Sequence, residues 1–188
     1  MFRLTPVTIV LVAVMLTSGC SMMAPLYTAS IDNVQTLKDA GNVKVKVDAF
    51  KAASISQENA NPISIRGSSL ASPYNASYAA YLTEAIRQEL SLAQRLSPDA
   101  TVEITGILLK NDIDASGFSI GFAVVEARFI VKRSGQISYD QIKSVRHEFP
   151  SSFAGAVAIP RAVQEYAFAI QKLLASLYAD PAFLSSLK

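Results

Sequence analysis

The fold is decided by residues 118–131, which read FSIGFAVVEARFIV. Apolar residues occupy alternate positions, as they do in a β-strand that buries one face. The alternation changes phase, because the apolar side chains lie on even positions up to Val124 and on odd positions from Val125 onward. Since a shift of one residue exchanges the two faces of a strand, the pattern predicts a long strand with a bulge or sharp twist near Val124 and Val125.

The segments on both sides complete a β-meander. Residues 101–109 alternate in the same way, and residues 137–149 follow after a glycine-containing turn. Strands joined by short connections pair antiparallel, so these three are predicted to be neighbours. Residues 43–50, VKVKVDAF, predict an earlier strand, and residues 51–72, rich in Ser, Asn, Gly and Pro, predict a long loop.

Two long helices are predicted around these strands. The first runs from about residue 73 to 96, with Ser72 as its N-cap and proline at the first helical position. The second opens near Pro160, and its apolar residues recur at steps of four and three up to Leu177; a short helix over residues 180–187 follows. We therefore expect an α+β fold with a four-stranded, mostly antiparallel sheet, two long helices on one face, and the order β-α-β-β-β-α.

The N-terminus has the three parts of a cleavable secretion signal. Arg3 gives a positive start, residues 7–16 are apolar apart from Thr8, and residues 17–19 are small. A membrane-spanning helix needs about 20 apolar residues, and this stretch is too short. We predict that residues 1–19 are a signal peptide, residues 20–41 a lipidated N-terminus and tether, and residues 42–188 a single α+β domain in the periplasm.

Residues 16–20, LTSGC, resemble the lipobox of bacterial lipoproteins, although Thr17 stands where Leu is commonest in that family. In the family, the cysteine thiol receives diacylglycerol, the signal is cut before the cysteine, and the new amine is acylated. The resemblance implies cleavage between Gly19 and Cys20 and makes Cys20 the acylated first residue of the mature chain. Since Asp after the cysteine favours retention in the inner membrane in that family, Ser21 implies sorting to the outer membrane.

Composition excludes several classes of partner and chemistry. Cys20 is the only cysteine, so no intramolecular disulfide can form. The sequence has 17 Lys and Arg residues, and removal of the signal with Arg3 leaves 16. Against 15 Asp and Glu residues, this gives the mature chain a net charge of +1. This balance, without any polybasic run, gives no reason to expect nucleic-acid binding. No nucleotide, dinucleotide, zinc-protease or nucleophile-elbow motif occurs, so no cofactor is predicted.

His147, the only histidine, is the first candidate for chemistry. A triad or a zinc site needs converging partners, which the spacing does not supply, so a partly buried strand histidine is favoured. Residues 112–117, DIDASG, match the first half of a calcium loop, but the twelfth position is Ala123 rather than Glu, and a hairpin turn is favoured. We predict no catalytic residue and no metal site; hydrolysis would require acidic residues that meet His147 in a cleft.

Two groups of side chains are candidates for binding a partner. Tyr74, Tyr78 and Tyr81 follow helical spacing and suit either core packing or an interface. Residues 149–160, FPSSFAGAVAIP, are far more apolar than a solvated loop, so they are either buried or a contact surface. Phe153, Val157 and Ile159 are the candidate contact residues of that segment.

The same segment, together with Tyr139-Asp140 and Glu165-Tyr166, resembles uncharacterised proteobacterial outer-membrane lipoproteins from the first strand to the C-terminus. The element order is also similar to that of small periplasmic lipoproteins of the lipopolysaccharide-assembly, penicillin-binding-protein-activator and ABC-transport auxiliary types. The expected function is that of a non-enzymatic, outer-membrane-anchored lipoprotein, an accessory or adaptor that binds an envelope protein. The alternative is a lipid- or small-ligand-binding module, which would need an apolar cavity between sheet and helices.

Overall fold

The computed structural model describes residues 21–53 and 62–188. Cys20 and the predicted signal peptide lie outside these residues. The described elements, in chain order, are β1 (Ser21–Met23), α2 (Ile31–Asp39), β2 (Val45–Val47), β3 (Lys51–Ala52), β4 (Ile63–Ile65), β5 (Ser68–Ala71), α3 (Tyr78–Leu92), β6 (Val102–Asp114), β7 (Ile120–Arg133), β8 (Gln136–Pro150), α4 (Gly155–Tyr178) and α5 (Pro181–Ser186). The predicted α+β class is confirmed.

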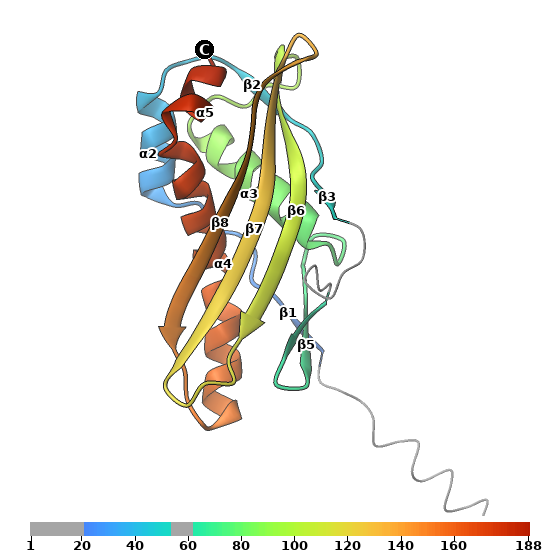
Figure 1. Cartoon of the computed structure of the whole chain (residues 1–188), viewed down its shortest axis with the longest axis vertical. Coiled ribbons are helices and arrows are strands. Elements are labelled where there is room, and N and C mark those ends of the chain that lie inside the picture. Colours follow the sequence, from blue (N-terminus) through green and yellow to red (C-terminus); the bar gives the residue numbers. More distant parts are fainter. Residues whose placement is uncertain (1–20, 54–61) are drawn as a thin grey trace, which may run out of the picture.

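Three long strands, β6, β7 and β8, form the predicted antiparallel meander (Figure 1). The bulge predicted near Val124 and Val125 is wrong, because β7 buries every odd-numbered residue from Gly121 to Val131 without a change of phase. The register shifts elsewhere. The β6–β7 pairing shifts between Leu108 and Lys110 of β6, and the β7–β8 pairing shifts next to Val131 of β7. The apolar residues on even positions remain on the outer face of the sheet, so the change of phase reflects an outer face that is partly apolar.

The sheet is mixed and not the predicted four-stranded antiparallel one. The described residues form a five-stranded sheet in which β2 and β3 both pair parallel with β6, and a second sheet with the order β1-β5-β4. The chain passes through α3 between β2 and β6, which allows the two strands to run in the same direction. The predicted strand 43–50 is interrupted, because the Phe50 amide donates to the Thr83 hydroxyl of α3 at 3.0 Å.

The two long helices are confirmed, with different starting points. Ser77, not Ser72, is the N-cap of α3, and its hydroxyl accepts from the Ala80 amide at 3.2 Å. The helix cannot begin earlier because Asn75 and Ala76 have positive φ angles. In α4, Pro160 lies inside the helix, which begins at Gly155, one turn earlier than predicted. Pro160 lacks the N–H that would donate to the carbonyl of residue 156.

The segments predicted as a tether and a long loop contain regular structure. Residues 21–41 hold β1 and α2, and residues 62–72 hold the hairpin of β4 and β5. Buried Ala24, Tyr27 and Leu37 dock the first segment on the domain. Ala24 and Tyr27 belong to a short apolar run, residues 22–27, and Leu37 follows ten residues later, so no helical or strand periodicity predicted their burial. In Figure 1 the β1–β5 pair lies toward the lower end of the long axis and α2 toward the upper end.

Candidate functional site

His147 of β8 lies in a cluster of charged side chains contributed by α4. Its Nε2 is 2.6 Å from Glu165 Oε2, and its Nδ1 is 2.8 Å from Lys172 Nζ. The Lys172 ammonium can only donate, so Nδ1 accepts and Nε2 carries the proton that is donated to Glu165. Arg161 contacts the other oxygen of Glu165 at 2.6 Å. An acidic residue therefore does converge with the histidine, across 18 residues of sequence.

The cluster lacks the access that hydrolysis requires. His147 is 7% exposed and Glu165 is 4% exposed. Both ring nitrogens are engaged by α4, which leaves neither one to accept a proton from a substrate. The rings of Phe149 and Phe168 lie near the imidazole, at centroid distances of 6.3 and 6.4 Å. These polar contacts join α4 to β8.

The predicted turn at residues 112–117 is held by Asp114, whose Oδ1 accepts from the Ser116 amide at 2.7 Å. Hydrogen bonding from Ser116, by its side chain foremost and then by its amide, lowers the pKa of Asp114. Across the residues that the structure describes, no three His, Cys, Asp or Glu side chains are grouped as a metal site would need.

A second buried carboxylate, Glu89 of α3, holds the N-terminal segment. Its Oε1 accepts from the Tyr27 hydroxyl at 2.6 Å, the Ser30 amide at 3.0 Å and the Asn33 side chain at 3.1 Å. Burial raises the pKa of Glu89, and burial together with Glu89 raises the pKa of Tyr27. Glu89 thus joins Tyr27, Ser30 and Asn33 of the N-terminal segment to α3, in addition to the pairing of β1 with β5.

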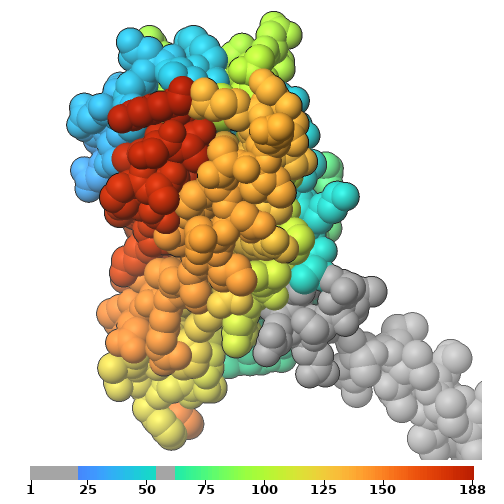
Figure 2. Space-filling view, turned by 45° about the horizontal axis from the view of Figure 1, so that its top comes forward, coloured from blue at the N-terminus to red at the C-terminus, as the bar shows by residue number. Residues whose placement is uncertain are grey.

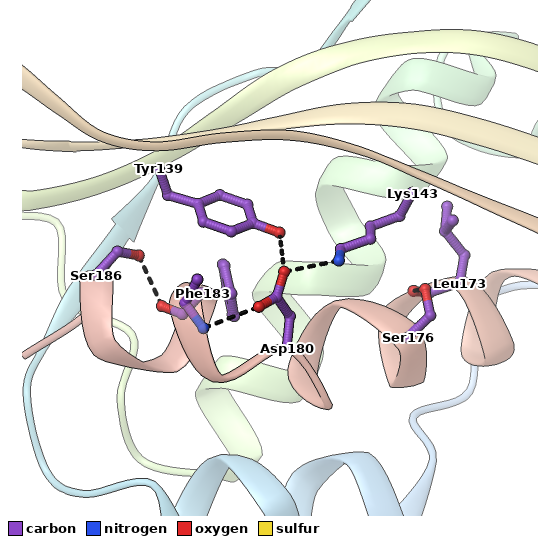
Figure 3. A network of polar contacts seen from close by, with 8 residues as sticks. Tyr139, Lys143, Leu173, Ser176, Asp180, Phe183 and Ser186 are labelled. Carbon is purple, nitrogen blue, oxygen red and sulfur yellow. Dashed lines mark hydrogen bonds and ion pairs between the residues drawn. The ribbon is translucent and has the colours of Figure 1, made fainter.

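A third polar network joins the α4–α5 junction to β8 (Figure 3). Asp180 Oδ2 accepts from Lys143 at 2.7 Å and from the Tyr139 hydroxyl at 2.8 Å, while Oδ1 accepts from the Ala182 amide at 2.8 Å. These bonds, that from Lys143 foremost, lower the pKa of Asp180 to about 2. Figure 3 shows Asp180 pointing toward the strand. Asp180 thus caps the N-terminus of α5 and joins it to β8. The His147 and Glu89 clusters also join one secondary-structure element to another.

The structure separates the three tyrosines predicted as candidate contacts. Tyr78 and Tyr81 are fully buried against Tyr166, with ring centroids 4.9 and 5.2 Å away, so their prediction as partner-binding residues is wrong. Their helical spacing directs them toward α4 and the core. Tyr74 is half-buried, and its hydroxyl accepts from the Tyr27 amide at 3.2 Å.

Phe153 and Val157, by contrast, are exposed. Phe153 contacts Phe118, which sequence reasoning did not name as a candidate contact residue, and Ile120 of β7 is exposed as well. Phe118 is 76% exposed and Phe153 is 75% exposed, and their rings stack with centroids 5.4 Å apart and planes 5° from parallel. We call Phe118, Ile120, Phe153 and Val157 the apolar end. The remaining candidate, Ile159, packs partly buried against the core.

A second exposed apolar surface is a hollow of about 240 Å³ between α2 and the end of α3. Ile31 is 86% exposed and Leu92 is 53% exposed at this hollow. Sequence reasoning missed it because α2 was not predicted. The residues that line this α2–α3 hollow are Ala29, Ser30, Ile31, Val34, Lys38 and Leu92.

The other described hollows do not provide the apolar cavity that a lipid-binding module would need. The largest, of about 380 Å³, is an open surface hollow with Lys38, Lys44 and Arg95 among its lining residues. Two more, of about 340 and 290 Å³, lie beside Arg87 at the surface. Between sheet and α4, Phe129, Tyr166 and Ile170 are fully buried members of one core. Among the described helices, none combines the length and apolar character needed to cross a bilayer.

Comparisons with known proteins identify the fold. No family model and no curated protein sequence matches the chain. Protein XCC0632 from Xanthomonas campestris, a DUF330 protein, has a TM-score of 0.60 at 14% identity, over 89% of this chain and 97% of that chain. An uncharacterised protein has a TM-score of 0.52 at 11% identity, over 85% of this chain and 96% of that chain.

A minor lipoprotein from Acinetobacter baumannii gives a TM-score of 0.41 at 9% identity, over 76% of this chain and 92% of that chain. At these identities, the first two likenesses show the fold alone, and the third is too weak to support a conclusion. Solved structures with this fold thus include a protein of the uncharacterised family DUF330. Function has to be argued from this chain's own surfaces.

Proposed function

We propose that the protein is a non-enzymatic lipoprotein, acylated at Cys20 and anchored in the outer membrane with its domain in the periplasm. In this proposal it is an accessory or adaptor that binds an envelope protein through the α2–α3 hollow. The observation that carries the proposal is the exposure of Ile31 and Leu92 around an apolar hollow. The three polar clusters support the non-enzymatic part, because the hydrogen bonds of each one join secondary-structure elements to one another.

The hollow suits an apolar side chain of a protein partner. Covering one exposed Ile or Leu side chain contributes about 1.5–3 kcal/mol, and interface energy is concentrated in a few such residues. The hollow is also pre-organised, because Glu89 fixes the segment before α2 and Asn33 donates to the Gln171 carbonyl of α4 at 3.0 Å. Binding would therefore cost little ordering of the chain.

Photo-cross-linking in intact cells tests this proposal. A photoreactive amino acid at Leu92 is expected to give one discrete adduct with an envelope protein, whereas the same group at Gln35, exposed on α2 but outside the hollow, is expected to give none. Ile31→Lys should abolish the Leu92 adduct because it places a charge at the rim. Since Ile31 is already exposed, that variant should change the free energy of unfolding by no more than about 0.5 kcal/mol.

The proposal fails if Leu92 gives no protein adduct, or if the adduct persists unchanged in Ile31→Lys. Positions 35 and 92 provide the internal comparison, because both lie on helices of the same folded chain. Circular dichroism of each variant confirms that the fold is retained.

A further inference from the structure

We propose that the apolar end is a second, non-covalent contact with the membrane, whose side chains enter the interfacial region of the phospholipid bilayer. This inference rests on the proposed acylation of Cys20. It assigns to the apolar end a partner different from the protein proposed for the α2–α3 hollow.

The apolar end is formed at two chain connections that carry no charged residue of their own. One leads from β6 into β7 and the other from β8 into α4. No Asp, Glu, Lys or Arg occurs at residues 115–121 or 149–160. Phe118 of one connection stacks on Phe153 of the other, while Ile120 and Val157 are also largely exposed. Several large apolar side chains exposed to water near one pair of connections mark a contact surface.

The connections are held in place by Arg66, in the turn between β4 and β5. Its guanidinium donates to the carbonyls of Ala115 at 2.6 Å, Ser152 at 2.8 Å and Phe153 at 2.8 Å. Arg66 itself has a φ of 48°, in the left-handed region that is unfavourable for a residue with a side chain. A strained residue that joins both connections fixes the apolar end in one arrangement before it meets a partner.

The path of the chain places the anchor beside this end. Ser21, the residue after Cys20, pairs with Ser69 of β5, the strand that follows the Arg66 turn. Consecutive Cα atoms are about 3.8 Å apart, so no spacer separates the acylated residue from the ordered domain. Figure 1 shows β1, β5 and the start of β7 toward the same end of the long axis, and in Figure 2 the yellow segment around residues 115–122 protrudes there.

The proximity of the apolar end to the proposed anchor favours the bilayer as its partner. Acyl chains on Cys20 bring the membrane surface to Ser21, and Glu89 prevents the N-terminal segment from lengthening into a tether. The apolar end then meets the zone where aromatic side chains are favoured in membrane proteins. The domain would be oriented with the β7–β8 turn and α2 directed into the periplasm.

Depth measurements on the acylated protein test this inference. Because the only natural cysteine is acylated in the mature chain, a cysteine introduced at Phe118 or at Phe153 can be labelled selectively with a nitroxide. Ile137 is the matched control, since it is exposed and lies at the opposite end of the β7–β8 pair. The labelled protein is reconstituted in vesicles of phosphatidylethanolamine and phosphatidylglycerol, and collision rates with oxygen and with a water-soluble nickel chelate are measured.

At positions 118 and 153, the ratio of oxygen to nickel collisions is expected to be several-fold higher than at position 137. Equal ratios at all three positions would overturn the inference. Protection from both reagents at positions 118 and 153 would also overturn it, because it would place a protein, such as a second copy of this chain, on the apolar end. Failure of the protein to remain with the vesicles would remove the proposed anchor as well.

Discussion

The substitution Cys20→Ala is expected to remove the protein almost completely from the outer membrane. The anchor depends on one thiol and the amine beside it, and each buried CH₂ of an acyl chain contributes about 0.8 kcal/mol to membrane binding. One chain alone binds only marginally, whereas the acylation implied for Cys20 places three on a single residue. By the same resemblance, the signal is cut only before a modified cysteine, so the variant should keep residues 1–19. Separation of inner and outer membranes on a density gradient, followed by immunoblotting, measures the loss.

Ser21→Asp is the matched variant for that experiment. It keeps the acylated cysteine, and the resemblance implies that Asp at this position retains the protein in the inner membrane. Acylated protein should therefore shift between the two membrane fractions, whereas Cys20→Ala should yield unacylated precursor. The anchor prediction is wrong if Cys20→Ala enters the outer-membrane fraction as efficiently as the native chain.

The substitution Glu89→Ala is expected to lower the free energy of unfolding by about 3–5 kcal/mol. It removes the acceptor of three hydrogen bonds, from Tyr27, Ser30 and Asn33, in a site closed to water. Buried donors that lose their acceptor cost about 1–3 kcal/mol each, and partial relaxation of the segment limits the sum. Denaturant unfolding measures the loss, and hydrogen exchange should show that the amides of residues 27–34 lose protection.

Two variants of α3 give this prediction its controls. Glu84 lies on the same helix and pairs with Arg87 at the surface, so Glu84→Ala should change stability by less than about 1 kcal/mol. Glu89→Gln keeps one acceptor oxygen and should lie between the native chain and Glu89→Ala. If Glu89→Ala is no more destabilising than Glu84→Ala, Glu89 does not hold the N-terminal segment.

The parts of the fold that could be predicted are those with a repeated pattern. The strands within residues 101–150 and the apolar steps of α4 are long enough for periodicity to decide their type. Parallel pairing of β2 and β3 with β6 depends on where α3 returns the chain, which no local pattern shows. The segment at 21–41 is held by three separated apolar residues and a carboxylate from α3, so its order is a tertiary effect.

The candidate surfaces could likewise be predicted only where a local pattern marked them. Phe153 and Val157 stood out because apolar residues were crowded in a connection. Phe118 and Ile120 were correctly assigned to one face of a strand. Their apolar character predicted that this face was buried before a bulge, whereas both side chains are exposed. Alternation alone cannot distinguish a bulge from a strand whose outer face is also apolar. The meeting of His147 with Glu165 depends on the packing of α4 against β8, which no local pattern in the sequence predicts.

The most direct test of the anchored lipoprotein is mass spectrometry of its mature N-terminal peptide, purified from membranes. The peptide is expected to begin at Cys20, with a diacylglyceryl group on the thiol and a further acyl chain on the amine. A mature peptide that begins at any other residue, or one that begins at Cys20 with an unmodified thiol, would contradict the proposal that the domain works at the surface of a membrane.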